Sequence, residues 1–202
     1  MTHSTLHRLQ AGELAGAREL KLSADLRTVP DALRDLAPTL EVLDLSGNQL
    51  TTLPDWLGEF TRLRVLFASN NPFTVLPPVL GSLPELSMVG FKANRITHVP
   101  PEALAPTLRW LILTDNALTE LPARIGHCAP MEKLMLAGNR LRTLPESLAQ
   151  CQALALLRIS ANQLDALPGW LLTLPRLAWL ACAGNPFNAA AESRALAQAQ
   201  AT

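Results

Sequence analysis

The sequence predicts a single domain of the α/β repeat class, built as a curved solenoid of about eight coils. We expect a parallel β-sheet on its concave face and short helical, 3-10 or extended segments on its convex face. Three observations predict this fold. An asparagine recurs at nearly constant spacing, a fixed apolar pattern leads up to each asparagine, and a Leu-Pro or Val-Pro pair follows most of them. Because one short repeat cannot bury its own apolar side, successive copies must stack.

The recurring asparagine marks the same point of each coil, where the chain turns. It occurs seven times at intervals of 22 or 23 residues, at Asn48, Asn71, Asn94, Asn116, Asn139, Asn162 and Asn185. Asp25 precedes the first of these by 23 residues and is expected to fill the same slot. The single short interval, from Asn94 to Asn116, contains Pro100-Pro101, and we expect the curvature to change there.

The apolar pattern before each asparagine predicts a short strand. In the copy that ends at Asn48 the pattern L-x-x-L-x-L-x-x-N is filled by Leu40, Leu43 and Leu45. Two leucines separated by one residue put both side chains on one face of a strand, so their neighbours point outward. We expect strands of successive coils to pair in parallel, about 4.8 Å apart.

The Leu-Pro pairs predict the return segment of each coil. Proline suits the first position of a short helical turn, because the N–H that it lacks is not needed there. After Leu53-Pro54, the spacing of Leu57, Phe60 and Leu63 predicts three side chains that point inward from the convex side.

These motifs, at this copy number, resemble the leucine-rich repeat family, and the 23-residue intracellular type most closely. The resemblance implies that each asparagine side chain bonds backbone groups of adjacent coils in a ladder. Segments 65–73, 88–96 and 108–116 are also similar to the repeat domain of bacterial leucine-rich-repeat-containing protein kinases. That likeness implies an alternative function, the regulatory or recognition domain of a larger bacterial kinase whose catalytic domain is absent from this chain.

The repeats are expected to occupy residues 17–187 of one domain. Residues 1–16 are predicted to form an N-terminal capping helix, with Leu6 and Leu9 facing the first coil. Residues 188–202 are Ala-rich and predict either a C-terminal helical tail capped by Asn188, with Leu196 as its one large apolar residue, or the start of a linker.

Composition weighs against several classes of function. Lys plus Arg equals Asp plus Glu at 17 each, so neither nucleic acid nor an anionic membrane surface is an expected partner. The sequence shows no signal peptide and no spanning run, which predicts a cytoplasmic protein, with a secreted bacterial effector as the alternative. The scattered histidines, and three cysteines without a CxxC pair, predict no metal site, cofactor or enzymatic activity.

The outward residues of the predicted strands form an apolar band on the concave face. Such a band predicts a protein–protein interaction module or scaffold that binds a partner protein there, with Trp110 and Trp179 as anchors. Self-association or intramolecular docking through this face, a sheet that binds nothing, and a scaffold for a Ras-type GTPase remain as alternatives. The predicted partner-binding residues are Val65, Phe67, Met88, Trp110, Ile112, Met135, Leu156, Arg158 and Trp179.

Overall fold

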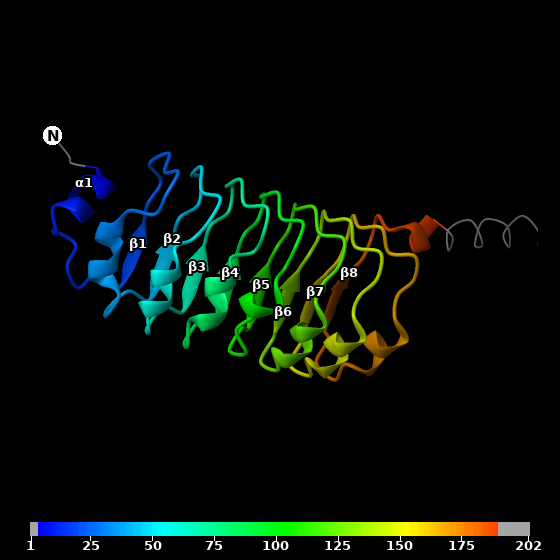
Figure 1. The fold of residues 1–202 in the computed structure, drawn as a ribbon. Coiled ribbons are helices and arrows are strands. Elements are labelled where there is room, and N and C mark those ends of the chain that lie inside the picture. The colour runs from blue at the N-terminus through cyan, green and yellow to red at the C-terminus, as the bar shows by residue number, and fades with distance from the viewer. Residues whose placement is uncertain (1–3, 190–202) are drawn as a thin grey trace, which may run out of the picture.

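Eight short strands form one parallel sheet in the order of the chain, in a computed structural model that describes residues 4–189 (Figure 1). Each strand pairs with the next in the register expected from the repeat, so that Val42 pairs with Val65 and Val65 with Met88. The strands are β1 (Glu19–Lys21), β2 (Val42–Asp44), β3 (Val65–Phe67), β4 (Met88–Gly90), β5 (Trp110–Ile112), β6 (Lys133–Met135), β7 (Leu156–Arg158) and β8 (Trp179–Ala181).

A short 3-10 helix completes each coil between successive strands. Figure 1 shows the coils stacked side by side, with the strands in one row and the helical segments in another. The predicted solenoid of about eight coils is therefore confirmed. The 3-10 helices are η1 (Asp31–Leu36), η2 (Asp55–Glu59), η3 (Pro78–Ser82), η4 (Pro101–Ala103), η5 (Ala123–His127), η6 (Glu146–Gln150) and η7 (Gly169–Thr173).

The hydrophobic core fills the space between the two rows. The central strand residue of β2 to β7 is fully buried, as Leu43 and Leu111 illustrate. From the other side Leu57, Phe60 and Leu63 are also fully buried, as their spacing predicted. Burial of apolar side chains from both rows makes each coil depend on its neighbours.

The asparagine ladder is formed as the resemblance implied. The amide oxygen of Asn71 accepts a hydrogen bond from the backbone N–H of Leu50, at 2.9 Å, in the preceding coil. Its amide nitrogen donates to the carbonyl oxygen of Leu45, also in that coil, and to that of Ala68 in its own. Asn71 is only 6% exposed, so its side chain satisfies backbone groups that water does not reach.

Asp25 does not continue this ladder into the first coil, contrary to the expectation. Its side chain is exposed and makes no hydrogen bond within residues 4–189, and its backbone takes a φ of 54°. The ladder begins with Asn48, whose amide oxygen accepts from the backbone N–H groups of Ala24 and Leu26, on either side of Asp25. In later coils the residue with this left-handed φ is the one before the ladder asparagine, such as Asn70 at 54° before Asn71, so Asp25 does not take the asparagine's place in the turn.

The recurring proline lies one residue earlier than predicted. Pro54 is the cap before η2, not its first residue, with an extended backbone at φ −71° and ψ 148°. Its carbonyl oxygen accepts the first 3-10 hydrogen bond, from the N–H of Leu57 at 3.0 Å. The proline ring fixes φ at a value that suits this extended residue equally well, which explains the one-residue error. Only in η3 and η4 does a second proline, Pro78 or Pro101, occupy the first turn.

The short fourth coil brings two 3-10 helices close together. There η4 is only three residues long, and Met88 pairs with Trp110, 22 residues later, where other coils step by 23. A Cβ atom added to Gly81 in η3 would lie 1.7 Å from the carbonyl oxygen of Glu102 in η4. Gly81 therefore permits this close approach, as Gly126 does between η5 and η6, where an added Cβ atom would lie 2.4 Å from the carbonyl oxygen of Ser147.

A six-residue helix lies at the N-terminal end of the stack, within the range where a capping helix over 1–16 was expected. Helix α1 (Thr5–Gln10) begins after Ser4, whose hydroxyl accepts a hydrogen bond from the backbone N–H of His7. Leu9 is buried, and Leu6 packs partly buried against the core. This helix buries the apolar side of the first coil.

The last described segment is a helical turn over 186–189. Asn188 was expected to cap it, but the turn begins earlier, and Asn188 lies inside it. The Asn188 side chain reaches back to accept a hydrogen bond from the backbone N–H of Asn185, at 3.2 Å, as the third residue of a capping box does. The remainder of the predicted tail, including Leu196, lies outside the described residues.

Candidate functional site

The first and third residues of the eight strands point away from the core, and we call the surface that they form the sheet face. The register aligns these residues in two rows that run across all the strands. All nine residues predicted to bind a partner lie on the sheet face, which the structure therefore brings together. Seven are half-buried, and Arg158 and Trp179 are exposed. Their role in binding stays a prediction.

Phe67 lies flat across the neighbouring strand. Its register partner on β4 is Gly90, and a Cβ atom added to Gly90 would lie 2.6 Å from Cδ1 of Phe67. The ring thus occupies the space that a side chain on β4 would fill, and it leaves Gly90 buried. Replacing Gly90 with a larger residue would push the ring off the sheet.

Trp110 is held on two sides by its neighbours on the next coil. The ammonium group of Lys133 lies 3.6 Å from the centre of the indole ring, in cation–π geometry. The indole N–H donates to the carboxylate of Glu132, at 3.4 Å. Contacts within the chain therefore hold the Trp110 side chain in place.

The sequence did not identify Glu132 and Arg109 as members of the site. Arg109 pairs with Glu132, and the pair holds the acceptor of the Trp110 hydrogen bond in place. The Arg109 hydrogen bond holds the pKa of Glu132 below its usual value, although burial opposes this effect. The signal was present in the repeat, because the residue just before five of the first six strands is charged, namely Arg18, Glu41, Arg64, Arg109 and Glu132. The same position forms the chain of ion pairs Arg18–Glu41–Arg64.

At the N-terminal end of the sheet face two of the three charges, Lys21 and Asp44, are paired with each other, whereas Glu19 is exposed and makes no ion pair within residues 4–189. Lys21 lies 3.5 Å from the carboxylate of Asp44, its register partner on β2. Burial raises the pKa of Asp44, but hydrogen bonds from Ser46 together with the Lys21 charge outweigh it, so the pKa is lowered. These neutralised charges leave the apolar side chains of the middle strands as the distinctive part of the face.

The C-terminal end of the sheet face is different, because it carries exposed side chains and its one charge has no counter-ion among the described residues. Trp179 is 58% exposed. Arg158 makes no ion pair and no side-chain hydrogen bond within residues 4–189. Leu180 points inward from β8 but is still 37% exposed, whereas its register partner Leu157 is fully buried.

The cysteines offer no reactive thiol in the core. Cys128 and Cys151 are fully buried and unbridged, and each S–H donates to a backbone carbonyl of a neighbouring coil. Burial raises the pKa of Cys128 to about 12 and that of Cys151 to about 11, so neither forms a thiolate at neutral pH.

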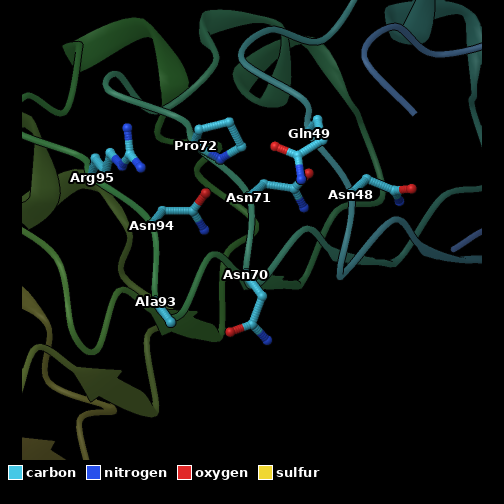
Figure 2. Close-up of a pocket in the computed structure, with 8 residues that line it drawn as sticks. All are labelled: Asn48, Gln49, Asn70, Asn71, Pro72, Ala93, Asn94 and Arg95. Atoms are coloured by element: carbon cyan, nitrogen blue, oxygen red, sulfur yellow. The ribbon is translucent and has the colours of Figure 1, made fainter. Parts of the chain in front are cut away.

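A shallow polar hollow lies where the strands turn. Figure 2 shows Asn48, Asn71 and Asn94 on successive coils of this hollow, beside Asn70 and Arg95. The amide groups of the three ladder asparagines are already hydrogen-bonded to the backbone. Within residues 4–189 no group of three His, Cys, Asp or Glu side chains is placed to hold a metal ion. None of the described helices has the length and apolar character to cross a membrane.

Comparisons with known proteins agree with the fold. A family model described as Leucine Rich Repeat matches residues 39–60 and 62–83. The chain is 29% identical to the LRR ectodomain of the Arabidopsis thaliana receptor kinase GASSHO1/SCHENGEN3, solved in complex with CASPARIAN STRIP INTEGRITY FACTOR 2. That match covers 88% of this chain and 22% of the other, with a TM-score of 0.73. No match was found among curated proteins.

Two further solved structures share the fold. The plant peptide hormone receptor RGFR1, in complex with RGF2, is 27% identical over 88% of this chain and 30% of its own, with a TM-score of 0.74. An internalin of Listeria monocytogenes is 20% identical over 85% of this chain and 49% of its own, with a TM-score of 0.69, and shows the fold alone. The chain thus spans about a fifth to a half of these proteins.

The parallel sheet, the asparagine ladder and the 3-10 return segments define a repeat solenoid. The family match over residues 39–60 and 62–83 and the likeness to these structures agree that this fold is the leucine-rich repeat solenoid.

Proposed function

We propose that this chain is a protein-interaction module that binds a protein or peptide partner through its sheet face. The observation that carries the proposal is the alignment of Phe67, Met88, Trp110, Met135 and Trp179 on one surface. Aromatic and methionine side chains are enriched in protein interfaces, and a contiguous apolar surface that is partly exposed is typical of an interaction site.

The likeness to two receptors supports a peptide or protein ligand. Both were solved in complex with a partner, one with CASPARIAN STRIP INTEGRITY FACTOR 2 and the other with RGF2. The proposal assigns this chain a binding role and no reaction. We place it in the cytoplasm.

A capture experiment with matched variants tests the proposal. The baits are the wild-type chain, the sheet-face variant Trp110→Ala/Trp179→Ala, and the control Val75→Ala/Leu172→Ala. Val75 and Leu172 are exposed apolar residues outside the strands, 39% and 93% exposed. Circular dichroism and thermal unfolding first verify that all three are folded.

We expect wild type and control to capture the same partner from the source lysate, and the sheet-face variant to lose it. Capture of the same proteins by all three baits would show that the sheet face is not the binding surface.

A further inference from the structure

We infer that the partner of the sheet face presents an acidic side chain, flanked by large apolar side chains, to Arg158. This inference rests on the proposed function and adds the chemistry of the partner. Arg158 is exposed and has no counter-ion within residues 4–189, and the one other unpaired charge of the face, Glu19, lies on β1 at the opposite end of the sheet. Lys21 pairs with Asp44, and Lys133 stacks on Trp110.

On the neighbouring strands no acidic side chain is free to pair with the guanidinium group of Arg158. Strands β6 to β8, together with the residue that precedes each of them, contain a single acidic side chain, that of Glu132. Glu132 is already paired with Arg109. On β8 the register partner of Arg158 is Ala181, whose small side chain leaves the space beside the guanidinium open. An arginine in this setting offers two parallel N–H donors to a carboxylate.

Apolar side chains lie on both sides of Arg158. Met135 is its register partner on β6, and Ile112 follows on β5. Toward the other edge Trp179 stands on β8, next to Leu156. A segment that passes over Arg158 therefore contacts apolar surface before and after it, which fits an internal acidic side chain better than a terminal carboxylate.

The spacing of the strands sets the length of this partner segment. Crossing from β5 to β8 takes three steps of about 4.8 Å, or roughly 14 Å. An extended chain covers that distance in about four residues. The acidic residue and its apolar neighbours should thus fall within one short stretch of sequence.

Selection from random linear peptides displayed on phage tests the inference with the full chain as bait. Wild type is compared with Arg158→Glu and with Arg124→Glu. Arg124 is also exposed, but it lies in η5, on the row of 3-10 helices, so that variant makes the same charge change away from the sheet face.

We expect wild type and Arg124→Glu to enrich peptides with Asp or Glu beside large apolar residues. The Arg158→Glu variant should lose that preference. For a selected peptide, replacing its acidic residue by the amide should weaken binding to wild type about tenfold, the effect of one charge-assisted hydrogen bond. The same replacement in the peptide should not weaken its binding to an Arg158→Gln variant of the protein, because that variant has no guanidinium group to pair with the acid.

Two outcomes would contradict the inference. Peptides that require Trp110 and Trp179 but show no preference for an acidic residue would overturn the role of Arg158 and leave the proposed function standing. Enrichment of no peptide, or only of peptides that bind the Trp110→Ala/Trp179→Ala variant equally well, would contradict both.

Discussion

Asn70 and Asn71 are neighbours with opposite environments. Asn71 is buried in the ladder, whereas Asn70 is exposed and holds a left-handed φ of 54°. We expect Asn71→Ala to lower the free energy of unfolding by about 3 kcal/mol, because it leaves buried backbone groups without partners. Asn70→Gly should have little effect, since glycine adopts this φ readily. Urea denaturation of both variants measures the difference, and equal losses would contradict the ladder's role.

Glu132 makes stability depend on pH. Its pKa in the folded protein is lowered, chiefly by the hydrogen bond from Arg109, below the ordinary value of 4.5. The charged form therefore stabilises the fold above pH 4.5, and this contribution is lost as the pH falls through the folded pKa. We expect wild type to lose more stability on acidification than Glu132→Gln does. Chemical denaturation midpoints of both, followed from neutral to acidic pH, test this, and parallel curves would exclude such a contribution.

At the scale of single elements, the contact between η3 and η4 depends on Gly81. We expect Gly81→Ala to destabilise the protein by about 2 kcal/mol or more, because its Cβ would overlap the backbone of Glu102. Gly169→Ala is the matched control, since a Cβ there meets no atom within 4 Å. Thermal unfolding compares the two, and a Gly81→Ala protein as stable as the control would show that the short coil relaxes without cost.

Most of the element-scale fold could be predicted from the sequence, because each coil repeats one pattern of buried and exposed residues. The strand positions and the inward leucines follow directly from that periodicity. The cap position of Pro54 could not be predicted, since proline's φ suits both candidate positions. The contacts that hold Trp110 could not be predicted either. They come from Glu132 and Lys133, 22 and 23 residues away, and the repeat spacing does not specify the rotamers of these side chains. The kinase-associated role and the cytoplasmic location stay predictions.

For the whole molecule, a stack of coils predicts a gradient of stability. Among residues 4–189, four of the five exposed large apolar residues, Leu167, Leu172, Trp179 and Leu180, belong to the last described coil. The amide of Ile159 bonds to Ala181 in β8, whereas that of Leu113 bonds to Met135 in the middle of the sheet. We expect faster hydrogen exchange at Ile159 than at Leu113, as measured by NMR, because local opening starts where neighbours are fewest. Equal protection at both would indicate a single cooperative unit.

The central claim, that the sheet face holds the partner, is tested most directly by photo-crosslinking. Benzoylphenylalanine is placed at Ile112, in the middle of the sheet face, or at Leu172 in η7, and each protein is irradiated in source lysate. We predict a covalent adduct with a partner protein from position 112 and none of that mass from position 172. An adduct that forms equally from both positions, or only from position 172, would contradict the claim.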